Sequence, residues 1–452
     1  MKIGIVGWGV EGQSAYRYFG PEHQYLIVNE HPRDDFPPES DKLQIKFLTE
    51  ERPPGVTSNV TDLSYLEGID KCDKIIYSVT SVKNLERRFG EDKKFWQKAT
   101  TSQHIFFEEV KTKNIIGVTG TKGKGTTATL IYQMLKASGL KVFLGGNIGT
   151  SILDFVNDVK PNDWVVLELS NFQLYNFPYS PHIGVCLMIT DEHQDWHTSV
   201  DEYIKTKINL FSHQSKDDIA IYFADGELSK QIAGTSPGIK IPYFAKPGAV
   251  VKDEGVIVVG DPETEVIKTD QLKLIGRHNL ENICAAVTTV WQVVQDKEAI
   301  QKVLSTFTGL EHRLEFIREL GNVKYYDDSF GTTPQTAITA MKAFTQPKVM
   351  ILGGIDKGLS FDSLANEVVK NRVRHAILIG HVAPKIATLL RDNNFSQITT
   401  GLKNMDEIVK TAREVAEPGD VVLLSPASSS FDMFKDYKQR GEKFKAAVRA
   451  LA

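Results

Sequence analysis

One stretch of the sequence decides the fold, and it reads Ile115-Ile116-Gly117-Val118-Thr119-Gly120-Thr121-Lys122-Gly123-Lys124-Gly125-Thr126-Thr127. Its apolar beginning, Ile115–Val118, predicts a buried strand, and a helical pattern follows over Ala128–Ser138. Glycines between a strand and a helix let successive backbone N–H groups turn toward an anion at the helix N-terminus. The stretch therefore predicts an α/β domain with a phosphate-binding loop.

The side chains of this loop are candidates for binding ATP. Lys124 is placed to reach the terminal phosphates. The strict P-loop pattern fails at two positions, because Val118 replaces its first glycine and Gly125 follows the lysine, so Thr126 or Thr127 must supply the magnesium-binding hydroxyl. A glycine-rich turn that only connects strand to helix is the alternative. The candidate ATP-binding residues are Gly120, Thr121, Lys122, Gly123, Lys124, Gly125, Thr126 and Thr127, and Thr126 is the candidate metal ligand.

Strand-like runs followed by helical stretches recur along the whole chain. This pattern predicts an α/β protein with mostly parallel sheets. Glycine-marked junctions divide it into three domains, expected at residues 1–100, 101–309 and 310–452, and a β-meander is expected within Phe244–Thr269. The expected strands are Lys2–Val6, Ile115–Val118, Trp164–Leu167, Ile219–Tyr222, Val349–Leu352, Ala376–Ile379 and Val421–Leu424.

The composition is that of a soluble globular protein and excludes several classes of function. The chain has 452 residues and a formal net charge of −4, which gives no support to a nucleic-acid or anionic-membrane partner. No apolar run approaches the roughly 18–20 residues that span a bilayer. Three widely spaced cysteines indicate buried thiols in a reducing compartment. The protein is expected to be cytoplasmic and monomeric.

Carboxylates and histidines follow two further apolar runs. Glu168 comes at the end of Trp164–Leu167, where a carboxylate beside a phosphate loop suits a hard cation such as magnesium; an exposed strand-end glutamate is the alternative. His193 and His197 stand four residues apart in an acidic segment. They lack a third zinc ligand at a recognised spacing, and a solvated acidic loop is the alternative.

The N-terminus carries a dinucleotide-type fingerprint, Gly7-Trp8-Gly9-Val10-Glu11-Gly12, after a strand and before a helix. Glu30 ends the next strand, about where an acid that binds ribose is expected. Taken alone, these residues favour a Rossmann-like domain of an NAD-dependent oxidoreductase, and this alternative stays open.

Several longer motifs resemble the Mur ligase family. Thr119–Lys124 is similar to its T-G-T-x-G-K loop, which folylpolyglutamate synthases share, and Leu167–Leu174 is similar to the L-E-[LV]-S-S-F-Q-L segment of the members that add D-glutamate. The segments Gly309–Glu315, Tyr326–Pro334, Leu352–Lys357 and Leu424–Gly441 resemble further family motifs, in order and over nearly the whole chain. The resemblance implies a Rossmann-like N-terminal domain, a P-loop-type central ATPase domain and a Rossmann-like C-terminal domain.

The resemblance also implies roles for residues whose chemistry is otherwise open. Lys124, Glu168, His193 and Lys207 become catalytic. The last three hold magnesium together with Thr126, and Lys207 does so as a carbamate, although from the residue alone it would be a surface charge, with Lys205 as the rival register. The other implied ATP-binding residues are Asn279, Asn282, Arg313 and Asp328.

Two substrate sites are implied in the same way. The UDP-substrate residues are Val10, Glu11, Asn29, Glu30, Asn147, Ser170 and Gln173, and the amino-acid residues are Thr332, Lys357, Ser430, Phe431 and Tyr437. The chain departs from the family pattern at Met188, at Phe330, where many relatives have lysine, and in the loop Ser78–Ser81. The diverged loop affects most the recognition of the nucleotide sugar, and at Phe330 one charge contact is missing or supplied elsewhere.

The implied reaction is an ATP-dependent amide ligation in peptidoglycan precursor synthesis. ATP, with Mg²⁺, converts the carboxylate of UDP-N-acetylmuramoyl-L-alanine to an acyl phosphate, which the amine of D-glutamate attacks. A folylpolyglutamate synthase-like ligase, favoured by Gly125, is one alternative, and a Mur ligase that takes L-glutamate is another. A nucleotide-binding protein without catalysis is a third.

Overall fold

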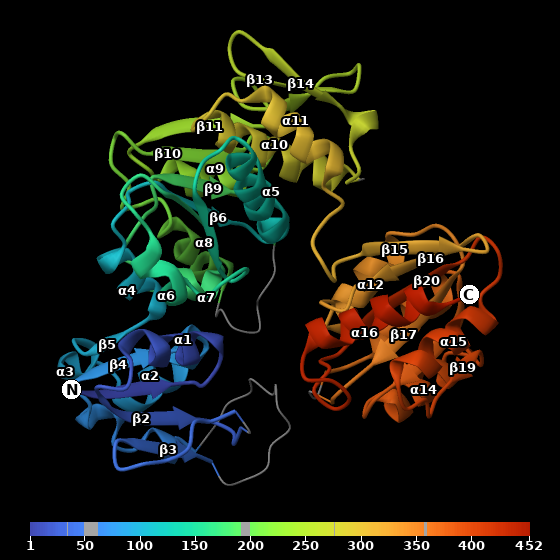
Figure 1. Ribbon diagram of the computed structural model, residues 1–452, viewed down its shortest axis with the longest axis horizontal. Coiled ribbons are helices and arrows are strands. Elements are labelled where there is room, and N and C mark those ends of the chain that lie inside the picture. Colours follow the sequence, from blue (N-terminus) through green and yellow to red (C-terminus); the bar gives the residue numbers. More distant parts are fainter. Residues whose placement is uncertain (34, 49–61, 191–198, 275, 357–358) are drawn as a thin grey trace. The chain divides into compact units, whose positions relative to one another are not determined.

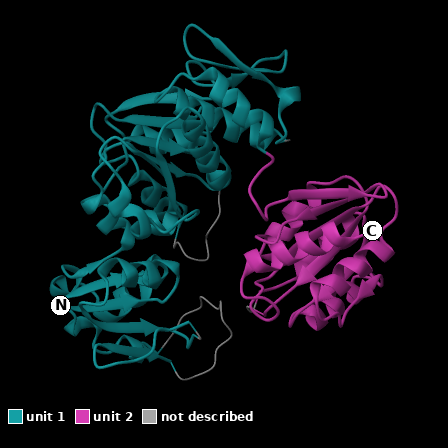
Figure 2. Ribbon diagram, viewed as in Figure 1, with its two compact units in different colours: residues 1–51, 59–307 teal, residues 52–58, 308–452 magenta. Residues whose placement is uncertain are grey.

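The computed structural model describes residues 1–33, 35–48, 62–190, 199–274, 276–356 and 359–452. These residues form two compact units, of which the first ends at Phe307 and the second spans Thr308–Ala452 (Figure 2). The first unit contains two parallel sheets and a small antiparallel sheet, and the second contains one mixed sheet (Figure 1). The finer division into three domains, at residues 100 and 309, stays a prediction.

The N-terminal sheet is parallel and has the strand order β3-β2-β1-β4-β5. Its strands are β1 (Lys2–Val6), β2 (Gln24–Asn29), β3 (Leu43–Phe47), β4 (Lys74–Tyr77) and β5 (Ala99–Thr100). Its helices are α1 (Val10–Phe19), α2 (Val82–Phe89), α3 (Lys93–Trp96) and α4 (Ser102–Glu109). The strand order reverses between β1 and β4, so the fingerprint loop at Gly7 meets Ser78. A Cβ atom on Gly7 would lie 2.9 Å from Cβ of Ser78.

The central sheet is also parallel, in the order β11-β10-β9-β6-β8-β7. Its strands are β6 (Ile115–Thr119), β7 (Val142–Gly146), β8 (Trp164–Glu168), β9 (Ile183–Cys186), β10 (Ile219–Phe223) and β11 (Ile239–Tyr243). The accompanying helices are α5 (Lys124–Ala137), α6 (Ile152–Phe155), α7 (Asn171–Leu174), α8 (Val200–Ile208), α9 (Glu227–Gly234), α10 (Arg277–Trp291) and α11 (Lys297–Thr306). Strand β6 lies between β8 and β9, so the carboxyl ends of the three strands are neighbours.

The predicted β-meander is confirmed as a separate antiparallel sheet of β12 (Val250–Val251), β13 (Val256–Val259) and β14 (Thr264–Lys268). The next α-helix along the chain is α10, which packs against α5. Short 3₁₀ turns occur at Ser64–Leu66, Ile69–Lys71, Val79–Ser81, Val156–Asp158 and Thr269–Gln271.

The sheet of the second unit has the order β15-β16-β20-β17-β18-β19, and only the edge strand β15 is antiparallel to its neighbour. Its strands are β15 (Glu315–Leu320), β16 (Val323–Asp327), β17 (Lys348–Gly353), β18 (Val373–Ile379), β19 (Ile398–Thr399) and β20 (Val421–Ala427). Helices α12 (Pro334–Lys342), α13 (Asp362–Lys370) and α14 (Ala383–Asp392) share one apolar core, and α15 (Met405–Val415) and α16 (Tyr437–Ala450) share another. Helices therefore cover both faces of the sheet.

The predicted α/β class is confirmed, with differences at the ends of elements. Helix α5 begins at Lys124, four residues before the expected start, because Gly123 at φ +83° is its N-cap and the loop lysine already belongs to the first turn. Most expected strands extend by one to three residues. Among the residues that the structure describes, no helix is long and apolar enough to cross a membrane.

Candidate nucleotide and amino-acid sites

The phosphate loop connects β6 to α5 and needs glycine at two positions. Gly120 has φ +154°, and a Cβ there would lie 2.6 Å from Cβ of Leu187. A Cβ on Gly123 would lie 2.0 Å from Oδ1 of Asn282. The loop is thus closely packed between the segment after β9 and helix α10, and its conformation excludes larger residues.

Lys124 folds over the loop that precedes it. Its Nζ donates to the carbonyl oxygens of Gly120 and Thr121 at 3.0 and 2.9 Å. The ammonium therefore lies directly at the loop, at the N-terminus of α5, where backbone N–H groups and the helix dipole favour an anion. Lys122, by contrast, is exposed.

The threonines of the loop differ in their surroundings. Thr121 is buried, and its hydroxyl accepts from the backbone N–H of Thr190 at 2.9 Å and lies 2.9 Å from the hydroxyl of Tyr203. It therefore joins the loop to α8. Thr127 is fully buried, and its Oγ1 is one of the few buried side-chain atoms in the described chain that lack a hydrogen-bond partner. The choice of Thr126 as the metal-binding hydroxyl stays a prediction.

Glu168 ends strand β8 and is buried beside the loop Gly146–Asn147. The Asn147 side-chain amide donates to Oε1 of Glu168 at 3.3 Å, and its backbone N–H donates to the Glu168 carbonyl at 2.9 Å. Gly146 has φ +94°, and a Cβ there would lie 2.2 Å from that carbonyl oxygen. The structure thus brings together a predicted metal ligand and a predicted substrate residue.

Lys207 on α8 is 1% exposed, so its interpretation as a surface charge is wrong, whereas Lys205 is exposed. The Lys207 Nζ donates to Oγ1 of Thr119 at 3.3 Å and to the carbonyl of Gly120 at 3.2 Å. Burial lowers the pKa of Lys207 to about 7, and the nearby charge of Lys124 acts in the same direction. At neutral pH a large fraction of this amine is uncharged.

Helix α10 brings the two predicted adenine residues to the loop. Asn282 is buried against Gly123, and its Nδ2 donates to Oδ1 of Asn279 at 3.4 Å. Both amides thus lie at the N-terminal end of α10, next to the phosphate loop.

Three of the predicted UDP-substrate residues meet in the first unit. Ser170 and Gln173 form a capping box at α7, in which Oε1 of Gln173 accepts from the Ser170 backbone and hydroxyl, both at 3.1 Å. Nε2 of Gln173 donates to Glu11 at 3.2 Å, and Gln103 donates to the same carboxylate at 2.5 Å. Burial raises the pKa of Glu11. Sequence reasoning missed Gln103, because no motif contains it.

The other N-terminal candidates are spread around the fingerprint loop. Asn29 accepts from the backbone N–H of Trp8 at 2.8 Å and donates to the carbonyl of His31. Glu30 accepts from Asn84 at 2.7 Å, and Val10 is exposed at the start of α1. The Asn29 bonds hold the fingerprint loop beside the end of β2, and the Glu30 bond ties that end to α2, so both residues already serve the local structure.

In the second unit Asp328 is buried directly after β16. Its Oδ1 accepts from the backbone N–H of Leu314 at 3.2 Å, and its Oδ2 accepts from the hydroxyl of Ser425 at 2.6 Å. Burial raises the pKa of Asp328 to about 7, although both hydrogen bonds oppose the shift. Asp328 thereby ties the turn that carries Arg313 to strand β20.

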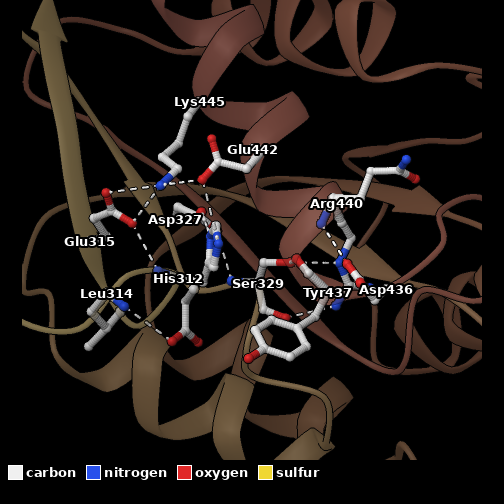
Figure 3. A network of polar contacts seen from close by, with 12 residues as sticks. His312, Leu314, Glu315, Asp327, Ser329, Asp436, Tyr437, Arg440, Glu442 and Lys445 are labelled. Atoms are coloured by element: carbon white, nitrogen blue, oxygen red, sulfur yellow. Dashed lines mark hydrogen bonds and ion pairs between the residues drawn. The ribbon is translucent and has the colours of Figure 1, made fainter. Parts of the chain in front are cut away.

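A fully buried arginine organises the surroundings of the predicted amino-acid site (Figure 3). Arg440 donates to the hydroxyl and the carbonyl of Ser329 at 2.9 and 2.8 Å and to the carbonyl of Ser428 at 3.1 Å. The Ser329 hydroxyl in turn donates to the carbonyl of Tyr437 at 2.7 Å. Arg440 lies within the motif Leu424–Gly441, but the sequence alone indicates no role for it.

The predicted amino-acid residues lie on the segments that Arg440 joins. Thr332 follows Ser329, Ser430 is buried in the serine turn after β20, and Tyr437 begins α16. Phe431 is 61% exposed. His193 and Lys357 lie outside the described residues.

Comparison with known proteins gives matches over most of the chain. The family models of the Mur ligase middle domain and of the Mur ligase glutamate ligase domain match residues 118–290 and 312–428. The UDP-N-acetylmuramoylalanine–D-glutamate ligase of Acetivibrio thermocellus is 40% identical, over 78% of this chain and 77% of that protein. The enzyme of the same name from Clostridioides difficile (strain 630) is 31% identical, over 100% and 98% of the two chains.

Solved structures show the same fold at lower identity. MurF ligase from Thermotoga maritima in complex with ADP aligns with a TM-score of 0.55 and 18% identity, over 100% of this chain and 95% of that one. E. coli FolC in complex with DHPP and ADP aligns with a TM-score of 0.56 and 15% identity, over 77% and 92%.

Proposed function

The chain belongs to the Mur ligase family, and from this premise we propose that it joins UDP-N-acetylmuramoyl-L-alanine to D-glutamate at the expense of ATP. The observation that carries the proposal is the meeting of two lysines at the phosphate loop. The amines of Lys124 and Lys207 both donate to the carbonyl oxygen of Gly120, at 3.0 and 3.2 Å. The Lys124 amine suits a phosphate, whereas the Lys207 amine is suited to form a carbamate.

The first half of the reaction is a phosphoryl transfer. An oxygen of the substrate carboxylate attacks the γ-phosphorus of ATP, the new P–O bond forms, and ADP leaves with the bridging oxygen. Lys124 and the N–H groups of the loop neutralise charge on the phosphates, which is catalysis by positioning and electrostatics. The product is an acyl phosphate.

The second half forms the amide. The neutral amine of the amino acid attacks the carbonyl carbon of the acyl phosphate, loses a proton to solvent, and gives a tetrahedral adduct. Phosphate leaves as the C–O bond breaks. We assign Thr332, Lys357, Ser430, Phe431 and Tyr437 to the amino acid, since hydroxyls and a lysine suit its carboxylates.

The donor set beside the loop fits magnesium. The carboxylate of Glu168 is buried and forms no ion pair with any residue in the described ranges, so a cation there would balance its charge. Glu168, the hydroxyl of Thr126 and a carbamate on Lys207 would supply the oxygen ligands that this ion prefers, with His193 as a further ligand. When bound, magnesium supplies charge neutralisation at the transferring phosphoryl group.

Lys207 meets the chemical requirement for carbamylation. Only the uncharged amine attacks CO₂, and its pKa of about 7 leaves much of it uncharged at neutral pH. The Nζ lone pair forms a C–N bond with the carbon of CO₂, and one proton is released. The neutral amine next to Lys124 thereby becomes an anion, which the Thr119 hydroxyl can stabilise by donating to it.

Phosphate release by the purified chain tests the proposal. With ATP and Mg²⁺ present, release is expected only when UDP-N-acetylmuramoyl-L-alanine and D-glutamate are both added, and K124M is expected to abolish it. Release that needs L-glutamate in place of D-glutamate would support an ATP-dependent ligase but contradict D-glutamate as its acceptor. Release with ATP alone, or with a dihydropteroate substrate and L-glutamate, would contradict the proposal, as would hydride transfer with NAD.

A further inference from the structure

We propose that Phe330 is a positioning residue that holds the guanidinium of Arg313 against its ring and directs the edge of that guanidinium toward a phosphate of the nucleotide. The inference rests on the proposed function and on the ATP-binding role that the resemblance to the Mur ligases implies for Arg313. It concerns a residue to which the reaction itself assigns no role.

The contact between the two side chains is a cation–π stack. Cζ of Arg313 lies 4.5 Å from the ring centroid of Phe330. A stacked guanidinium uses its face, whereas its five N–H donors lie in its plane and remain able to bind an anion. Within the part of the chain that the structure describes, the Arg313 side chain forms no hydrogen bond or ion pair. Phe330 thus orients the charge without neutralising it.

The backbone places the ring beside the arginine. The N–H of Phe330 donates to the carbonyl of His312 at 3.0 Å, one residue before Arg313. The ring also meets the edge of the Tyr437 ring, with centroids 5.2 Å apart and planes at 87°. The ring is therefore held from two sides, by its own backbone and by the first residue of α16.

The turn that carries Arg313 is unusual on both sides of that residue. His312 has φ +61° and Leu314 has φ +46°, a left-handed conformation that residues with a Cβ rarely adopt. Such a conformation persists only where the surrounding structure over-determines it. The turn that presents Arg313 therefore has an unfavourable backbone conformation on both sides of this residue.

Contacts with carboxylates hold His312 and Leu314 in this conformation (Figure 3). Nδ1 of His312 lies 2.7 Å from Oδ2 of Asp327, and the backbone N–H of His312 donates to Glu315 at 2.8 Å. The backbone N–H of Leu314 donates to Asp328. Lys445 donates to Glu315 at 3.2 Å, so the lysine compensates the negative charge of this acid.

These bonds fix the backbone on either side of Arg313 and leave its long side chain exposed, with its own rotational freedom. The ring of Phe330 removes that freedom. Backbone and side chain are thus positioned by two independent devices, and only the second can be removed without disturbing the buried network.

Nucleotide binding by variants of the full chain tests the inference. F330L keeps an apolar side chain and removes the ring, whereas F330Y keeps a ring face. F330L is expected to raise the Kd for ADP, measured by calorimetry, about two- to fivefold, which corresponds to about 0.5–1 kcal/mol. F330Y is expected to bind like the wild type, and so is the control F316L, which removes another exposed ring of the same unit.

A double-mutant cycle separates positioning from a general structural effect. In the R313A background, F330L is expected to cause no further loss of ADP affinity. In the wild-type background, F330L is expected to change the KM for ATP more than the KM for D-glutamate. Wild-type affinity in F330L, an equal loss in both backgrounds, or wild-type affinity in R313A would each overturn the inference. If the variants show the expected ADP affinities but the chain forms no amide, the inference about Phe330 is supported and the proposed function is contradicted.

Discussion

Lys207 in the first unit and Arg440 in the second are both buried basic residues, but at neutral pH only the arginine keeps its charge throughout. They are 1% and 0% exposed, and neither forms an ion pair with a carboxylate of the described residues. Burial lowers the pKa of both, to about 7 for the lysine and to about 10 for the arginine. Around neutral pH the lysine therefore exchanges its proton and the arginine keeps its charge.

The difference follows from the two functional groups. An ammonium concentrates its charge on one atom and is desolvated at high cost, so the neutral amine becomes competitive. A guanidinium spreads its charge and presents several N–H groups, which carbonyls and hydroxyls can satisfy. In one unit burial creates a group that can react, and in the other it creates a brace between three segments. Replacing the lysine by arginine, or the arginine by lysine, should therefore remove the respective property.

The largest effect is expected for K207R. A guanidinium does not form a carbamate and would keep a permanent positive charge beside Lys124. We expect amide formation at saturating substrates to fall by about 10²–10³-fold. K205R, an exposed lysine on the same helix, is the matched control and should retain wild-type activity. A K207R variant as active as K205R would show that Lys207 acts only through its charge.

The reverse exchange, R440K, should cost stability. A lysine reaches fewer of the acceptors Ser329 and Ser428 with its single nitrogen, so hydrogen bonds to a buried charge are lost. We expect the free energy of unfolding of the second unit to fall by about 2–4 kcal/mol, measured by urea denaturation. R449K, on the exposed side of the same helix, should change it little. Equal stability of the two variants would refute the role of brace.

A buried acid extends the comparison, because the pKa of Asp328 is raised to about 7. The stability that its protonated form contributes is fully present below about pH 3.8 and is lost as the pH rises through about 7. Between about pH 5 and 8 this loss should reach about 3 kcal/mol. D328N resembles the protonated form, so its stability should vary less over the same range. An unchanged pH profile in D328N would count against this assignment.

The smallest effect concerns pH and CO₂. The pKa of Lys207 is lowered to about 7, so its neutral form is abundant above that pH and declines by about tenfold per unit below it. Activity at a fixed CO₂ concentration should fall in the same way, and added CO₂ should shift the fall to lower pH. Circular dichroism at each pH serves as the control for unfolding. A profile that does not respond to CO₂ would exclude a carbamate.

Local features of the fold were predictable from local sequence. The strand, glycine loop and helix around Gly120 and Lys124 depend on neighbouring residues, and so does the fingerprint at Gly7, where β1 and α1 lie as expected. The boundary of α5 was misjudged, because a left-handed glycine at position 123 starts the helix inside the motif. The function of the Gly7 loop was not predictable, since dehydrogenases and ligases can share it.

The candidate sites were only partly predictable. Motifs indicated Glu168, Gln173 and Asp328. The structure brings the first two each to another predicted residue, and Asp328 to the turn that carries Arg313. Gln103 was missed because it belongs to no motif, although it shares the carboxylate of Glu11 with Gln173. Phe330 was noticed only as a departure from a pattern, and its stack on Arg313 became visible in three dimensions.

By itself, the sequence determined the succession of strands, loops and helices and the kinds of functional groups available. These follow from periodicity and from backbone preferences, which act between near neighbours. Only the tertiary structure decided which charges are buried and what partners they meet. Lys207 reaches Thr119 across 88 positions of the chain, and Arg440 reaches Ser329 across 111. Burial sums contacts from such distant segments, so the pKa of Lys207 and the role of Arg440 emerge only when the chain is folded.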